Sequence, residues 1–140
     1  MNWFTLALLS AIFAALTAIL AKIGVKNINS NLATAIRTVV ILIFVWGIVF
    51  FQREYKQLFS ISKRSVIFLI LSGITTGLSW LFYFRALQLG DTSKVVPIDK
   101  LSLLITIFLA VIILKEKVSI QIIFGGLLMS IGALLISLAK

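Results

Sequence analysis

YFRALQLGDTSKVVPIDKLSLLITIFLAVIILKEK, residues Tyr83 to Lys117, decides how this chain folds, because it places charged side chains inside an otherwise apolar sequence. A short turn at Gly90 interrupts the run, and Asp99 and Lys100 lie more than one helical turn inside the next apolar segment. A charge at bilayer depth is unfavourable by several kcal/mol unless it is paired or hydrated. The stretch therefore predicts a membrane protein with a polar cavity beside Asp99.

The composition predicts an integral membrane protein and excludes several classes of function. Apolar residues make up 61% of the chain and charged residues 12%, about half the charged share of a typical soluble domain. Without Cys or His, and with four acidic residues that show no metal-binding spacing, we expect no enzyme, no cofactor and no metal site. The net charge of +9 is scattered between apolar runs, which argues against nucleic-acid binding.

Five apolar segments are close to the roughly twenty residues that a helix needs to cross a bilayer. They predict one all-α membrane domain over residues 1–140, with helices at about 3–23, 32–51, 64–89, 94–114 and 118–138. Pro97 falls in the first turn of the fourth segment, where a missing N–H is tolerated.

The basic residues give little information on membrane orientation. Five spans place the loops with Arg53, Lys56, Lys63, Arg64, Lys115 and Lys117 on the N-terminal side. Lys22, Lys26, Lys94 and Lys140 lie on the other side, where three deeper basic residues can also be counted. Orientation follows Lys/Arg asymmetry between loops, so this near balance favours insertion in both orientations, although a modest preference for an inward N-terminus is compatible with it.

A polar stripe follows one face of the third segment. Ser72, Thr76, Ser79 and Tyr83 recur at helical spacing, and Trp80 flanks them. Hydroxyls in a helix often bond only to the preceding turn, which is the simpler interpretation. The alternative is a substrate path, which the aromatic neighbours and the nearby Asp99 favour.

Several charged residues are expected at one depth on one side of the membrane, since successive spans run in opposite directions. These are Lys22, Arg37, Arg85, Asp99 and Lys100, and Ser102 shares a helical face with Asp99. We expect Asp99 to bond to Arg37, Arg85 or Lys100. Two interpretations stay open: an ion pair that only stabilises the fold, and a site that binds a proton or substrate.

The fifth segment carries small residues on one face. Gly126 and Ser130 form a small-xxx-small pair, and Ala133 continues it. Such faces allow helices to approach closely, and we expect this contact to lie between subunits.

The motifs along the chain together resemble those of EamA-like members of the drug/metabolite transporter superfamily. They are WLFYFRALQLG at 80–90, VVPI at 95–98, Leu101-Ser102, Glu116, and the glycines at 125, 126 and 132. The likeness covers essentially the whole chain and is greatest to the short bacterial and archaeal subfamily.

The resemblance implies an inverted-repeat carrier in the plasma membrane. Most members have about ten helices in two inverted five-helix repeats, and this chain resembles one repeat. It implies that two copies pair, antiparallel, around a substrate pocket and transport by alternating access. The near-balanced loop charges point to the same arrangement.

We therefore expect a homodimeric carrier of a small polar or amphipathic metabolite. The alternatives are a flippase subunit for a lipid-linked group and a non-transporting accessory subunit. Asp99 is the expected cation or proton site, with Arg37, Arg85 and Lys100 setting its charge state or meeting an anionic group. The expected path-lining residues are Thr76, Trp80, Tyr83 and Ser102.

Overall fold

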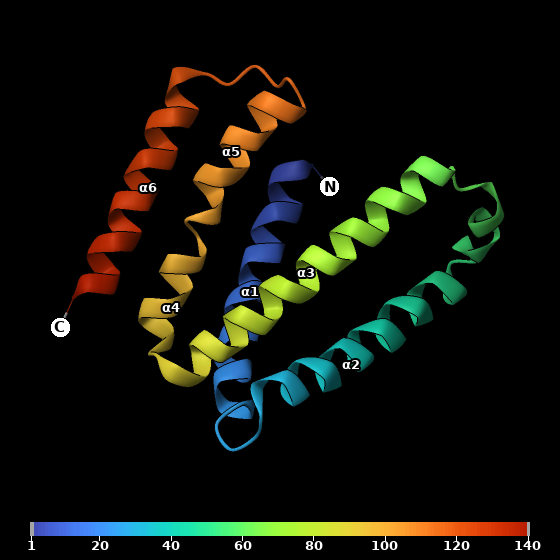
Figure 1. The fold of residues 1–140 in the computed structure, drawn as a ribbon. Helices are drawn as coiled ribbons and strands as arrows, with labels where there is room; N and C mark the ends of the chain where they lie inside the picture. The colour runs from blue at the N-terminus through green and yellow to red at the C-terminus, as the bar shows by residue number, and fades with distance from the viewer. Residues whose placement is uncertain (1, 140) are drawn as a thin grey trace. The chain divides into compact units, whose positions relative to one another are not determined.

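The computed structural model describes residues 2–139, and every regular element in that range is helical (Figure 1). The elements are α1 (Trp3–Gly24), α2 (Ser30–Phe51), the 3-10 helix η1 (Glu54–Ser60), α3 (Lys63–Leu89), α4 (Thr92–Asp99), α5 (Ser102–Ile113) and α6 (Ile120–Leu138). Five spans are long and apolar enough to cross a membrane, and the fourth, Thr92–Ile113, contains both α4 and α5. The prediction of five spans is confirmed.

The described residues group into two compact units. Residues 21–88 form the central unit, which holds the end of α1 together with α2, η1 and most of α3. Residues 2–20 and 89–139 form the terminal unit, which holds most of α1 together with α4, α5 and α6.

The core of the central unit lies where the end of α1, the start of α2 and the end of α3 meet. Its largest fully buried side chains are Val25, Phe84 and Leu87, at 1% or less exposed. Small residues surround them and let the helix ends approach closely. These are Ala21, Ser30, Ala33 and Thr34.

Polar side chains tie these helix ends together. Lys22 Nζ donates to the Leu87 carbonyl at 2.6 Å, and Gln88 Nε2 donates to the carbonyls of Val25, at 2.8 Å, and Ile28. The last carbonyls of a helix have no partner within the helix. The two side chains therefore satisfy backbone groups at the ends of α1 and α3 and fix the α1–α2 connection against α3.

The terminal unit is packed through α6. Figure 1 shows α4 and α5 side by side with α6, and both contact it. Gly126, Ser130 and Ala133 are buried on the inner face of α6, and a Cβ at Gly126 would lie 2.9 Å from Ile107 Cδ1. A close helix contact of this face exists within the chain, at Gly126, and the contact between subunits that we expect for the face stays a prediction.

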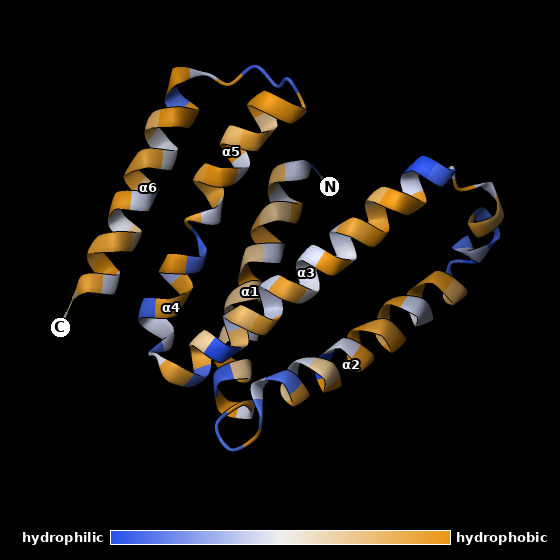
Figure 2. Ribbon diagram, in the orientation of Figure 1, coloured by the Kyte–Doolittle hydropathy of each residue, from blue (hydrophilic) through white to orange (hydrophobic). Residues whose placement is uncertain are grey.

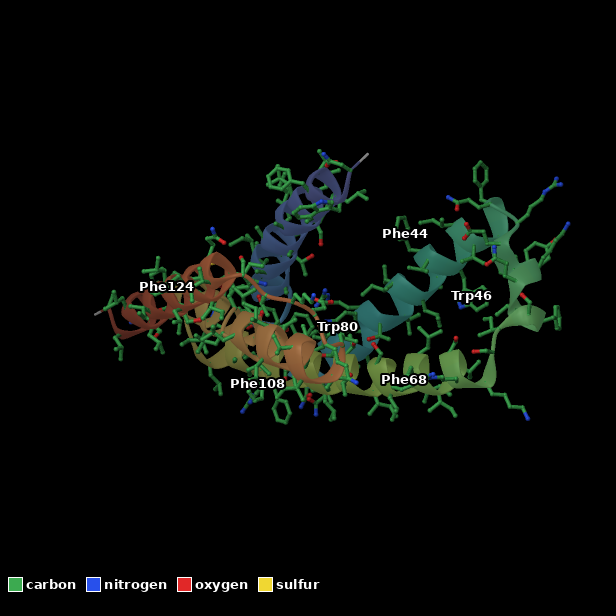
Figure 3. All side chains as sticks on the ribbon, turned by 90° about the horizontal axis from the view of Figure 1, so that it is seen from above. Phe44, Trp46, Phe68, Trp80, Phe108 and Phe124 are labelled. Carbon is green, nitrogen blue, oxygen red and sulfur yellow. The ribbon has the colours of Figure 1, made fainter. Side chains whose placement is uncertain are left out.

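Most large apolar side chains of the chain point outward. Figure 3 shows Phe44, Phe68, Phe108 and Phe124 projecting from their helices, and each is at least 60% exposed. Figure 2 shows the apolar colour all along the helices and the polar colour mainly in the connections and between α4 and α5. A surface of this kind is stable in lipid and not in water.

Candidate functional site

The interruption of the fourth span is the most distinctive feature of the backbone. The helix begins at Thr92, two residues earlier than predicted, so Pro97 lies inside α4 rather than in its first turn. There its ring removes an N–H that would bond to the Ser93 carbonyl. Four N–H groups between Lys100 and Leu104 then donate to the carbonyl three residues back, at 3.0 to 3.1 Å. This tighter 3-10 geometry separates α4 from α5.

Asp99 and Lys100 stand at this interruption as an ion pair. Lys100 Nζ lies 3.6 Å from Asp99 Oδ2, and their side chains are 57% and 38% exposed. Lys100 is therefore one of the three partners expected for Asp99. Ser102 follows as the first residue of α5, and it is exposed.

Arg37 of α2 contacts the aromatic face of α3 in the central unit. Its Cζ lies 4.1 Å from the centroid of the Phe84 ring and 5.8 Å from that of Trp80. A guanidinium over an aromatic face is attracted by the negative potential of the ring. Tyr83 joins the same aromatic group through an edge contact with Phe84, with ring centroids 5.4 Å apart.

Arg85 lies at the end of α3 and is held by Gln88. Its Nη1 donates to Gln88 Oε1 at 2.9 Å. Arg85 also borders a hollow of about 390 Å³ within the central unit. The other residues that line it are polar at the start of α2 and apolar on α3: Asn29, Ser30, Asn31, Leu81 and Phe82.

One hydroxyl of the predicted stripe on α3, that of Thr76, bonds to its own helix, as does that of its neighbour Thr75. Thr76 Oγ1 donates to the Ser72 carbonyl at 2.8 Å, and Thr75 Oγ1 donates to the same carbonyl at 2.9 Å. For Thr76 this agrees with the simpler interpretation, and it leaves the hydroxyl oxygen of Thr76 able to accept a further bond.

The structure thus groups the predicted site residues by unit. Arg37, Trp80 and Tyr83 gather around Phe84 in the central unit, and Asp99, Lys100 and Ser102 lie together in the terminal unit. Nowhere in residues 2–139 do three side chains of the metal-ligating types lie together.

The sequence interpretation missed two residues of this region, Phe84 and Gln88. Phe84 is the ring closest to Arg37, and Gln88 joins Arg85 to the α1–α2 connection. The sequence contains a pattern that indicates them, because Trp80, Phe84 and Gln88 recur every four residues and therefore share one face of α3.

Comparison with known proteins identifies relatives of this chain. The profile of the EamA-like transporter family matches residues 1–138. An uncharacterized transporter from the cobO 3′ region of a Sinorhizobium species is 48% identical over 136 residues, which cover 97% of this chain and 96% of that protein. An uncharacterized protein of Methanocaldococcus jannaschii is 28% identical over 87 residues, 62% of this chain and 64% of that protein. No solved structure matches the chain significantly.

Proposed function

Because the chain belongs to the EamA-like transporter family, we propose that it carries a small polar or amphipathic metabolite across the membrane by alternating access, as a homodimer. The chain is a multi-pass membrane protein with five spans. The observation that carries the proposal is the ionisable pair Asp99–Lys100 at an interruption of a membrane span. Ionisable residues inside membrane spans mark substrate or proton paths, and broken helices form binding sites in many transporters.

The backbone at the interruption supports a role as a hinge in the proposed conformational change. The short 3-10 stretch after Pro97 replaces the α-helical ladder over one turn. Such stretches inside a helix often act as hinges. In the proposed cycle α4 and α5 change their angle here, and this movement opens the site to one side of the membrane at a time.

The residues proposed for substrate binding or coupling are found in each of the two units. Asp99 and Lys100 supply charge at the hinge, and Arg37 and Arg85 supply positive charge from the central unit. Their proposed companions along the substrate path are Thr76, Trp80, Tyr83 and Ser102.

A second copy of the chain completes the proposed carrier. A single copy buries little of its spans, at most 17% of the most apolar window of any one. The near balance of loop charges leaves both orientations accessible. Two copies in opposite orientations would form the inverted repeats on which alternating access is based.

One observation favours a flippase of a lipid-linked group as the second candidate function. The hollow beside Arg85 is polar at the start of α2 and apolar along Leu81 and Phe82. A headgroup and the start of its acyl chains present the same two chemistries. A lipid substrate would therefore find both of its parts matched in this hollow.

Cysteine labelling in intact cells tests the antiparallel homodimer. The chain has no cysteine, and Asn27 and Gln57 are exposed in successive connections on opposite sides of the membrane. We expect single cysteines at both positions to react with an impermeant maleimide in comparable fractions. Labelling of only one position would exclude the antiparallel homodimer. An accessory role would instead be indicated if the purified protein formed no homodimer and required a different partner chain.

A further inference from the structure

Arg37 lies well inside a membrane span. It is the eighth residue of α2, so its Cα lies about 10 Å along the helix axis from Ser30 at 1.5 Å per residue. The following residues of α2 are almost all apolar up to Phe51. A guanidinium stays protonated in proteins at all ordinary pH values. The central unit therefore carries a permanent positive charge about two turns inside α2.

Aromatic side chains hold this charge in place. Phe84 is only 1% exposed, and its ring centroid lies 4.1 Å from Arg37 Cζ, with Trp80 at 5.8 Å. Rings attract the charge, but they offer no lone pair in the guanidinium plane. The aromatic contacts thus orient the group and leave its Nη1 without a hydrogen-bond partner among the described residues.

No carboxylate of the central unit can neutralise Arg37. Residues 21–88 contain eight lysines and arginines and a single acidic residue, Glu54. Glu54 follows the far end of α2, and Phe51 at that end lies fourteen residues, or about 21 Å along the helix, from Arg37. Arg37 Nη1 is buried and has no hydrogen-bond acceptor among the described residues. Asp99 of the terminal unit is already paired with Lys100.

We propose that Arg37 binds the anionic oxygen group of the transported solute, a carboxylate or a phosphate. This inference rests on the transport function proposed above and assigns a negative charge to the substrate. The guanidinium fork donates two parallel hydrogen bonds to two oxygens of such a group, which a lysine cannot do. The Arg37 side chain is only partly buried, so we expect the anion to approach its exposed part and reach the buried Nη1 from there, while Phe84 and Trp80 lie over the guanidinium.

Two sources can supply the same anionic group. One is a dissolved metabolite, and the other is the phosphate of a lipid headgroup that has a net negative charge, which phosphatidylcholine lacks and phosphatidylglycerol has. Both would make the same contacts with Arg37, so the experiment must separate them by the membrane in which the protein is placed.

Trp80 provides a direct reporter of the proposed site. The chain has three tryptophans, and replacing Trp3→Phe and Trp46→Phe leaves Trp80 as the sole source of indole fluorescence. The protein is placed in phosphatidylcholine nanodiscs and titrated with benzoate and phenyl phosphate. Benzamide and benzylammonium serve as the neutral and cationic counterparts. We expect a saturable change in Trp80 emission with the two anions only.

Substitutions assign the binding to Arg37. We expect Arg37→Gln to weaken anion binding by about tenfold or more, since a hydrogen bond to a charged group is lost, and Arg37→Lys to retain part of it. Arg64→Gln is the matched control, because Arg64 also lies over a ring, that of Phe68 at 5.8 Å, outside the site. It should bind like the parent.

The outcomes separate the possible failures. A saturable response to benzylammonium, no response to either anion, or full binding by Arg37→Gln would overturn the anion site. Phosphatidylglycerol in the nanodisc should compete with benzoate if lipid is the source and leave binding unchanged if a solute is. Anion binding without flux of phenyl phosphate in proteoliposomes would retain the anion site and reject the transport function. Flux of a cation would instead reject the anion site and retain the transport function.

Discussion

The close approach of α5 and α6 at Gly126 gives a sharp prediction about where the small-residue face of α6 makes its contact. A Cβ at this position would lie 2.9 Å from Ile107 Cδ1 and 3.2 Å from Leu104 Cδ2. Carbon atoms in contact prefer about 3.5 to 4.0 Å. The perturbation is Gly126→Leu, and Gly125→Leu is its control because nothing lies within 4 Å of a Cβ there.

The magnitude follows from two opposing effects. Replacing a helical glycine is favourable by up to about 1 kcal/mol, and overpacking a close contact costs about 1–3 kcal/mol. The propensity gain is common to both variants and cancels in their comparison. We therefore expect Gly126→Leu to be less stable than Gly125→Leu by about 2 kcal/mol, near the middle of the overpacking range.

The assay is reversible unfolding in mixed micelles with increasing SDS, followed by far-UV circular dichroism. Adding Ile107→Ala should restore about 1 kcal/mol or more to Gly126→Leu, because the contacting atom is removed. An intrachain contact predicts the same penalty at every ratio of protein to detergent. Equal stability of the two leucine variants, or a penalty that disappears on dilution, would refute the reasoning and return the face to a subunit contact.

Three further substitutions test the central unit, the α5 end and the ion pair with the same unfolding assay. Gln88→Leu removes bonds to Val25 and Ile28 and should lower stability by about 1–2 kcal/mol; the exposed control Gln121→Leu should change little, and equal effects would contradict the role of Gln88. Lys115 has a φ of 56°, a left-handed conformation in which a β-branched residue is strained. Lys115→Val should therefore lower stability by about 1–2 kcal/mol. An equal loss of stability in the control Lys117→Val would attribute the effect to the lost charge instead. Asp99→Asn should change stability by less than about 1 kcal/mol, since both side chains of the pair with Lys100 are more than a third exposed. The same substitution should abolish phenyl phosphate flux in proteoliposomes. Undiminished flux would show that Asp99 is not part of the site.

The sequence predicted the elements of this fold better than their contacts. The spans could be predicted because length and hydropathy alone decide whether a helix crosses a bilayer. The division of the fourth span could not, because it depends on backbone hydrogen bonds around Lys100 that periodicity does not report. Pro97 is the sign of this division in the sequence. A helix that starts at residue 94, as predicted, puts Pro97 in the first turn, whereas α4 starts at Thr92 and contains Pro97 in its interior.

The site residues divide in the same way. An isolated charge such as Arg37 in an apolar run is visible in the sequence, but its contact with Phe84 depends on how α2 crosses α3. The small face of α6 predicts a close contact and cannot name the partner, because the same residues suit any approaching helix. In the structure Gly126 lies against Ile107 and Leu104 of α5, and α4 also packs against α6.

The permanent charge of Arg37 leads to a prediction about the transport cycle. Under the proposed anion site, an empty carrier must pass through its occluded state with an unneutralised guanidinium, whereas a loaded carrier passes with the charge balanced. A lone arginine at the centre of a membrane helix costs about 2.5–3.5 kcal/mol on the insertion scale. Removing a barrier of that size accelerates the step by about 100-fold, at 1.36 kcal/mol per factor of ten. We therefore expect uptake of phenyl phosphate to be about 100-fold faster into proteoliposomes preloaded with phenyl phosphate than into empty ones, and Arg37→Gln to abolish that difference. Equal rates into loaded and empty vesicles would show that the empty carrier returns without this barrier, and that some other group neutralises Arg37 throughout the cycle.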